Sequence, residues 1–473
     1  MRRAGLLAAA ALLAGCALKT PPAPDEVLHQ ALPTTPLPPA WRAGAGADAG
    51  AVAAAWVRTF DDAQLDAIVA EAIAHNTDLR AAAARVEVAQ QAVIVAGAAM
   101  KPLVGVQLGG RSTYDHDAGS ANHATLGYLG VAWELDVWGR LRAQTDSAAY
   151  GAQAAALDYA WARESLAALT AKSWFLCIET RQLLALAEQA VGVYAELLQL
   201  VDARRKAGKD SDLNVAVVTA KLESARSSVE AARRSFGEAR RALEILLGRY
   251  PAAEIAIAPV YGRLPGPSGA SVPSALLERR ADIVAAERVV LAAFRQQEAA
   301  ELALLPSFAL SLDAGRLSNV VTSLLGLNPW LASAAIGMSI PIYEGGALKA
   351  QLAIATAQQA QAVANYGSVT LNALREVEDS LANESLLAAQ LPLDESSLRA
   401  RTDAVRIATL QFIAGRQDLL WVAELQTAQL ASQSNLIQLR AAQRANRIRL
   451  YQALGGGFGE ASEVAAAAPA AAN

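Results

Sequence analysis

Two very long predicted helices restrict the folds open to this chain more than any other feature. In the first, apolar and small residues recur in alternating steps of three and four, which is the spacing of a coiled-coil seam. The seam positions are Leu166, Leu169, Ser173, Leu176, Thr180, Leu183, Ala187, Ala190, Tyr194, Leu197 and Val201. A helix from Arg140 to Lys206 measures about 100 Å at 1.5 Å per residue, and a similar helix is expected from about Gly346 to Ala414. No compact globular core accommodates such helices, so they must lie side by side in a bundle or a barrel.

The chain repeats one structural plan twice. Ala207-Gly208-Lys209-Asp210 leads into a helical stretch ending Leu246-Leu247-Gly248, and Ala414-Gly415-Arg416-Gln417 leads into another ending Ala453-Leu454-Gly455. We therefore predict two repeats, each with a helix, a β-hairpin, a long helix and a last helix. The first repeat spans 56–260, with its hairpin at about 102–135 and its later helices at about 140–206 and 212–248. A linker (261–274) precedes the second repeat (275–458), with its hairpin at about 306–343 and its later helices at about 346–414 and 418–454.

The two predicted hairpins carry the pattern of membrane-spanning strands. Apolar residues alternate with small or polar ones, so each strand has one apolar face. The alternating apolar residues are Val104, Val106, Leu108, Phe308, Leu310, Leu312, Ala334, Ile336, Met338 and Ile340. A soluble hairpin packed on a core is the alternative. Membrane barrels have about 8 strands or more, so if these strands span a membrane, four strands per chain require oligomerisation, and three chains supply about 12.

The N-terminus predicts export and lipid attachment. A positive start and an apolar stretch precede Leu13-Ala14-Gly15-Cys16, which resembles the bacterial lipobox, in which the cysteine becomes lipid-modified and the new N-terminus. We expect a lipoprotein signal peptide at 1–15, lipidation at Cys16 and a lipidated linker over 16–55. An ordinary signal peptide with an incidental cysteine is the alternative. Ala17 stands where an Asp tends to retain lipoproteins at the inner membrane, which points to the outer membrane.

Charge and motifs exclude several functions. The formal net charge is −4, and it falls to about −6 when two arginines leave with the signal peptide, which argues against nucleic acid as a partner. No metalloprotease, phosphate-loop or nucleophile-elbow pattern occurs, so we expect no catalytic residue, cofactor or metal. The best metal-like group, Asp115-His116-Asp117 with His123, lies between two predicted strands and fits an exposed loop; the sequence assigns neither histidine a role. Cys177 is expected to be a small buried packing residue, and the Ala-rich tail over 459–473 to be disordered.

Five short motifs follow one another in a family-like order. They are Trp133-Glu134-Leu135-Asp136-Val137-Trp138-Gly139-Arg140, Leu277-Glu278-Arg279-Arg280-Ala281-Asp282-Ile283, Ile340-Pro341-Ile342-Tyr343-Glu344-Gly345-Gly346, Arg375-Glu376-Val377-Glu378-Asp379-Ser380-Leu381 and Tyr451-Gln452-Ala453-Leu454-Gly455-Gly456-Gly457. Together they resemble the TolC-like outer-membrane efflux proteins, in their lipoprotein branch, over nearly the whole mature chain. Ala281 stands where the family usually has Pro, a departure that touches only local turn rigidity.

This resemblance implies a mainly α protein with a membrane β-barrel portion. It implies a homotrimer whose 12-stranded barrel lies in the outer membrane and whose helices form an α-helical barrel in the periplasm. An equatorial belt, built partly from Pro251 to Pro273 and the C-terminal tail, surrounds the helices. The implied partners are outer-membrane lipid, a periplasmic adaptor (membrane fusion) protein and an inner-membrane pump. The implied function is a passive duct that exports small toxic compounds; a type I-like protein secretion duct and a pore-less periplasmic coiled-coil scaffold are the alternatives.

In this family the duct closes at its periplasmic end, where each long helix turns into the last helix of its repeat. The candidate gate residues are Asp418, Arg416, Asp212 and Asp210. The first two are expected to bond across the threefold axis in the closed state, while Asp212 and Asp418 equally suit helix capping or first-turn roles. The candidate adaptor contacts are Arg204, Arg205, Lys206 and Lys209. A solvated helix end is the alternative for this basic cluster.

One residue departs from the helical plan. Pro392 lies inside the second long helix. A proline there removes a backbone hydrogen bond and costs about 3 kcal/mol. We therefore predict a bend near Leu391.

Overall fold

The computed structural model describes residues 18–43, 55–117, 119–266, 269, 272–318 and 331–457. The predicted signal peptide, Cys16 and the tail after residue 458 lie outside the described residues. The helices are α2 (Pro24–Ala31), the 3-10 helix η1 (Trp56–Phe60), α3 (Ala63–His75), α4 (Thr77–Ala98), α5 (Arg140–Lys206), α6 (Asp212–Leu246), α7 (Pro273–Arg279), α8 (Ala281–Leu302), α9 (Ala347–Ile413) and α10 (Leu419–Ala453). The strands are β1 (Leu103–Asp115), β2 (Ser120–Leu135), β3 (Ser307–Ser318) and β4 (Leu331–Ser339).

The chain divides into two compact units, and each takes segments from both halves of the sequence. Unit 1 comprises the described residues of 1–36, 84–157 and 282–369, and unit 2 those of 37–83, 158–281 and 370–473. The helices α4, α5 and α9 contribute residues to both units. The two predicted repeats therefore do not form two separate compact bodies, and their boundaries stay a prediction.

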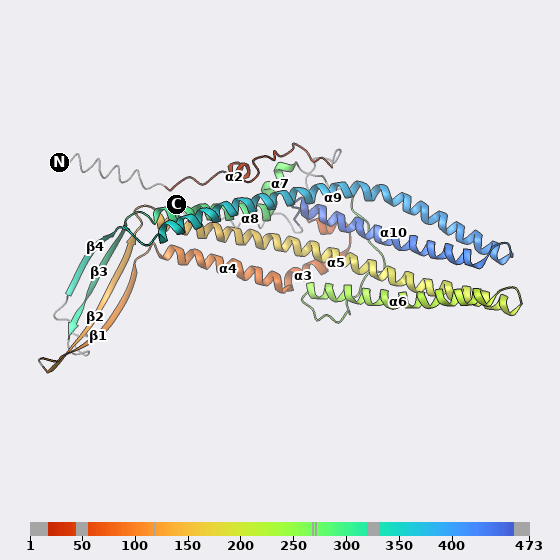
Figure 1. Ribbon diagram of the computed structural model, residues 1–473, viewed down its shortest axis with the longest axis horizontal. Coiled ribbons are helices and arrows are strands. Elements are labelled where there is room, and N and C mark those ends of the chain that lie inside the picture. Colours follow the sequence, from red (N-terminus) through yellow and green to blue (C-terminus); the bar gives the residue numbers. More distant parts are fainter. Residues whose placement is uncertain are drawn as a thin grey trace. The chain divides into compact units, whose positions relative to one another are not determined.

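Unit 1 contains one four-stranded antiparallel sheet in the order β1-β2-β3-β4 (Figure 1). Its register pairs Val104 with Val131, Val131 with Leu312 and Leu312 with Ala334. Alternate residues of a strand point to the same face, so the alternating apolar residues of all four strands share one face. Within the described residues, β1 and β4 each have a strand on one side only.

Unit 2 contains two helical hairpins. Figure 1 shows α6 running back along the last part of α5, and α10 running back along the last part of α9. Near the turns, a core of buried residues joins the two hairpins; it contains Tyr194, Leu197, Val201, Val218, Leu222, Ala225, Ala408, Phe412, Leu419, Val422 and Ala423. A larger core packs α5 against η1, α3, α6 and α10, with Trp174 and Trp56 among its largest buried side chains.

A single chain covers only part of the coiled-coil seam predicted along α5. Leu197 and Val201 are buried as predicted, whereas Leu169 and Leu176 are 50% and 47% exposed. Trp174 and its neighbours are buried instead, because α5 packs against several elements of unit 2 on different sides and not against a single partner helix. Cys177 is a free, fully buried cysteine, as predicted, and burial raises the pKa of its thiol to about 12.

The two long helices, α5 and α9, are each continuous. Among the described residues, α5 is the one helix that is long and apolar enough to cross a membrane by length and composition. The second long helix, α9, continues through Pro392 from Ala347 to Ile413. Pro392 therefore does not end the helix, and the bend near Leu391 stays a prediction.

A buried carboxylate holds the segment that follows α6. Glu244 is 2% exposed, and its carboxylate accepts hydrogen bonds from the backbone N–H groups of Ala253, Glu254 and Ile255 at 2.6, 2.6 and 2.9 Å. Burial opposes the ionisation of Glu244, but the three amides and Arg240 outweigh it, so the pKa of this carboxyl lies below its usual value. The ionised Glu244 carboxylate therefore holds this segment in place.

Replacing Glu244 by alanine is expected to lower the free energy of unfolding by about 2–3 kcal/mol at neutral pH, because buried amides lose a charged acceptor. The pKa is lower in the folded than in the unfolded chain. The contribution of Glu244 is therefore present above the unfolded pKa of about 4.3 and is lost as the pH falls through the folded pKa. Denaturant titration of both proteins near neutral pH and near pH 3 measures this. An equal difference at both pH values contradicts the role of the charge.

Candidate functional site

The sheet presents two chemically different faces. On the apolar face, Val106, Leu108 and Ile336 are 69%, 74% and 72% exposed, so nothing in a single chain covers them. On the other face, the register aligns Gly130 with Asp313 and Asp313 with Ser333. The apolar face suits contact with lipid, and the small and polar face suits contact with water.

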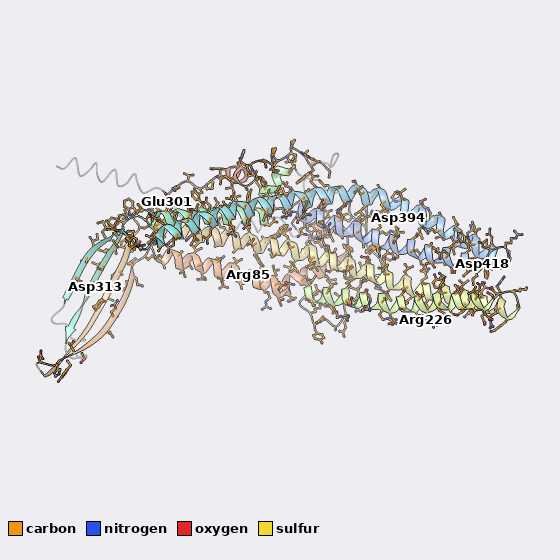
Figure 2. The ribbon with its side chains drawn as sticks, in the orientation of Figure 1. Arg85, Arg226, Glu301, Asp313, Asp394 and Asp418 are labelled. Atoms are coloured by element: carbon orange, nitrogen blue, oxygen red, sulfur yellow. The ribbon has the colours of Figure 1, made fainter. Side chains whose placement is uncertain are left out.

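The small and polar face carries its own hydrogen bonds. The Tyr128 hydroxyl donates to the Gln107 side chain across β1 and β2. The Ser333 hydroxyl donates to the Asp313 carboxylate at 3.5 Å, from β4 to β3, and Figure 2 labels Asp313 on this sheet. Polar groups therefore gather on the face opposite the exposed apolar rows.

The two helical hairpins turn with the same backbone geometry. At the first turn (residues 207–211), Gly208 donates to the Arg205 carbonyl and Lys209 to the Arg204 carbonyl. At the second turn (residues 414–418), Gly415 and Arg416 make the equivalent bonds to Phe412 and Gln411. The glycines have φ of 69° and 71°, the left-handed conformation in which glycine ends a helix at low cost. Both turns therefore end a long helix in the same way.

The candidate gate residues of the second turn lie apart from any ion pair within the described part of the chain. Asp418 is exposed and caps α10, accepting a hydrogen bond from the Leu420 N–H at 3.1 Å. Arg416 is exposed, and Figure 2 shows Asp418 at the end of the α9–α10 hairpin. Asp418 therefore has a structural role, and its charge remains available to a neighbouring group.

The candidate gate residues of the first turn make local contacts. Ser211, and not Asp212, is the N-cap of α6; it accepts from the Asn214 N–H at 3.3 Å, and Asp212 is the first residue of the helix. Asp212 pairs with Arg205 at 3.3 Å. The Asp210 carboxylate is 4% exposed and accepts from the Asn214 side chain at 2.6 Å. Asp210 thus stabilises its own turn.

Most of the basic cluster proposed to contact an adaptor is already paired. Arg205 and Lys206 lie 2.9 and 2.6 Å from the Asp202 carboxylate. Their hydrogen bonds hold the pKa of Asp202 below its usual value. Lys209 is exposed and makes no ion pair among the described residues.

Arg204 joins the two hairpins, a role that the sequence did not indicate. Its Nε lies 3.5 Å from the Asp210 carboxylate, and its guanidinium carbon lies 4.5 Å from the centroid of the Phe412 ring on α9. A cation over an aromatic face gains about 2 kcal/mol when both are shielded from water. Because α5 and α9 are distant in the sequence, no local pattern signals this pair.

A second polar link lies farther from the turns. The Thr427 hydroxyl on α10 donates to the Ala423 carbonyl at 2.8 Å and lies 3.0 Å from both the Tyr194 hydroxyl on α5 and the Lys221 ammonium on α6. One hydroxyl has one donor and two acceptor positions, so Thr427 is fully used. It borders a cavity of about 480 Å³ between these helices. Thr427 therefore ties both hairpins together.

Comparisons with known proteins agree on one family. The family model described as "Outer membrane efflux protein" matches residues 68–249 and 272–456. The pyoverdine export outer membrane protein OpmQ of Pseudomonas aeruginosa is 30% identical over 471 residues, which cover 97% of each chain. The cation efflux system protein CusC of Escherichia coli K12 is 27% identical over 408 residues, covering 85% of this chain and 89% of CusC.

Solved structures share the fold over most of the chain. The outer-membrane channel OprN has a TM-score of 0.82 at 25% identity, covering 90% of this chain and 98% of OprN. The CmeC outer membrane channel of Campylobacter jejuni has a TM-score of 0.84 over 96% of both chains; at 19% identity it shows the fold alone.

Proposed function

Because the chain belongs to the outer membrane efflux protein family, we propose that three copies form a passive duct that carries small toxic compounds across the outer membrane. The observation that carries this proposal is the sheet register, which places the apolar residues of four strands on one exposed face. A coiled-coil scaffold without a pore has no use for such a face. The duct therefore explains the sheet better than the scaffold does.

The trimer follows from strand number and open edges. Four strands are fewer than the roughly 8 that a closed membrane barrel needs, whereas three chains supply about 12. β1 and β4 lie at the two edges of the sheet of one chain. Pairing β4 of one copy with β1 of the next removes every edge, as a membrane requires.

The proposed partners are a periplasmic adaptor protein and an inner-membrane pump, with Cys16 carrying the lipid. Curated relatives are named for different cargoes, among them pyoverdine export for OpmQ and cation efflux for CusC. A duct without its own chemistry is compatible with such variety, because selection then rests with the pump. A protein secretion duct remains the second candidate, and export tests on a deletion strain with toxic compounds and secreted proteins distinguish the two.

Single-channel recording of the purified protein in a planar bilayer tests the duct directly. Discrete channels of small conductance are expected, because the turns of unit 2 close one end of the duct at rest. A well-folded oligomer that forms no channels in any variant contradicts the duct and favours the scaffold.

The gate is proposed to involve Asp418 and Arg416, bonding across the threefold axis in the closed state. Asp418→Ala and Arg416→Ala are expected to raise the conductance by at least about twofold. Each variant removes a contact of the closed state, which shifts the equilibrium between the closed and open states toward the open one. Asp418→Asn separates charge from capping, since asparagine keeps the N-cap. If Asp418→Asn conducts like the unmodified protein while Asp418→Ala does not, Asp418 acts only as a cap.

A further inference from the structure

The chain near its N-terminus is held by charged groups of α8. The Lys19 backbone N–H donates to the Glu298 carboxylate at 2.6 Å, and the Lys19 carbonyl accepts from the Arg295 guanidinium at 2.9 Å. Arg295 and Glu298 also pair with each other at 2.6 Å, with side chains only 9% and 4% exposed. The Arg295 Nε also lies 3.4 Å from the Asp146 carboxylate, so the pair is held by one further side chain and by the main chain of Lys19, which binds both of its members.

Further contacts hold the chain at Leu18 and Lys19. The Lys19 ammonium reaches Glu301 at 2.5 Å on the surface, and Figure 2 labels Glu301 on α8. A Cβ added at Gly139 lies 2.7 Å from the Leu18 side chain, so Leu18 packs directly before the start of α5. The two hydrogen bonds to the Lys19 main chain are partly buried, because the Arg295 and Glu298 side chains are buried, whereas the Lys19 side chain is 54% exposed.

This place is the junction between the sheet and the helices of unit 1. Leu18 packs against Gly139, between the end of β2 and the start of α5. The Trp138 indole donates to the Pro306 carbonyl at 2.7 Å, directly before β3. Cys16 is three residues from Lys19, and three residues span at most about 11 Å. With Lys19 held, this chain length limits how far Cys16 can move away from the junction.

We propose that Arg295 and Glu298 form a latch that grips the main chain of Lys19 and holds the lipid-bearing end of the chain beside the strand–helix junction. The latch goes beyond the duct function, and only its lipid part rests on the proposed modification of Cys16. While the latch is closed, the lipid proposed on Cys16 stays near the strands, so the lipid and the strands enter the same membrane. An open latch frees the chain that precedes α2 and lets the anchor move away from the junction.

Trypsin cleavage after Lys19 tests the latch in the full-length protein in membranes. The double variant Arg295→Met/Glu298→Leu removes both charges together and leaves neither one buried alone. Cleavage between Lys19 and Thr20 is expected to be at least about tenfold faster in this variant, because a protease needs a free main chain. The matched control is Glu301→Gln, which removes only the exposed contact of the same lysine and should change the rate less than about twofold. Equal rates in the unmodified protein and the double variant overturn the latch.

A second measurement needs no variant. Hydrogen exchange of the Lys19 amide in the unmodified protein is expected to be at least about tenfold slower than in an unstructured peptide of the same sequence. Exchange at the peptide rate overturns the proposal, even if the double variant fails to fold. The mass of the peptide that trypsin releases reports the lipid separately. An unmodified peptide refutes lipidation and leaves the latch intact, whereas a peptide of residues 16–19 with acyl chains confirms lipidation; the cleavage and exchange rates alone decide the latch.

Discussion

Replacing Arg447 by alanine is expected to lower the free energy of unfolding by about 3–5 kcal/mol, the usual cost of removing one partner of a buried ion pair. Arg447 on α10 is 2% exposed and pairs with Glu384 on α9. Its guanidinium also donates to the carbonyls of Pro265 and Gly266. The variant therefore removes a charged donor from two carbonyls and from the Glu384 carboxylate, which keeps the Asn446 side chain as a partner at 3.4 Å. Denaturant titration followed by far-ultraviolet circular dichroism measures the change.

The matched control lies on the same two helices. Arg440 of α10 pairs with Glu395 of α9 at 3.0 Å, but both side chains are partly exposed, at 46% and 35%. Exposed pairs contribute about 0–1 kcal/mol, so Arg440→Ala should scarcely change stability. The double variant Arg447→Met/Glu384→Leu should recover most of the loss, because no unpaired charge remains. A loss in Arg447→Ala no larger than in Arg440→Ala contradicts the buried role of Arg447.

Replacing Arg204 by alanine is expected to raise the open probability of the channel about tenfold. Arg204 is the cation that joins the first turn to Phe412 of the second hairpin. Under the proposed gate, opening separates the two hairpins and breaks this contact. Losing a shielded cation–π contact then costs the closed state about 1.4–2 kcal/mol, and 1.4 kcal/mol is a tenfold change in an equilibrium constant. Single-channel recording measures open probability directly.

The neighbouring arginine provides the control for this experiment. Arg205 pairs with Asp202 and Asp212, which belong to its own hairpin, so Arg205→Ala removes charge without separating the hairpins. Phe412→Leu keeps an apolar side chain and removes the ring, and it should act like Arg204→Ala. If Arg205→Ala opens the channel as much as Arg204→Ala, net charge at the turn, and not the link between hairpins, controls opening.

Sequence periodicity predicted the helices and strands well because it is a local property. The structure has a helix from Arg140 to Lys206 and hairpins where apolar residues alternate. The turn glycines at 208 and 415 also follow from local chemistry, since an αL helix end favours glycine. Within one chain, Leu169 and Leu176 of the predicted seam are exposed, and α5 instead packs Trp174 and its neighbours against several elements, which a heptad pattern does not reveal.

Long-range contacts of charged residues could not be predicted in this way. Arg447, Arg204 and Arg295 each bind a group distant in the sequence, such as Glu384, Phe412 or the Lys19 carbonyl. A buried arginine has no distinctive local pattern in one sequence. The basic cluster near the first turn differs: the spacing of Asp202 from Arg205 and Lys206 on one helix favours their pairing, whereas the pair of Arg204 with Asp210 depends on how the chain turns.

The pairing of β2 with β3 has a consequence for how the chain folds. Each hairpin closes through a local connection, and isolated hairpins form in about 1–10 μs. The strands β2 and β3, by contrast, lie on opposite sides of α5, α6, α7 and α8 in the sequence, yet pair from Thr125↔Ser318 to Leu135↔Phe308. Bringing them together closes a long loop, which is entropically costly and slow. The pairing of β2 with β3 is therefore a late step in folding. Until it forms, four strand edges per chain are open to wrong partners, so β1 and β2 must avoid wrong partners until β3 and β4 are available.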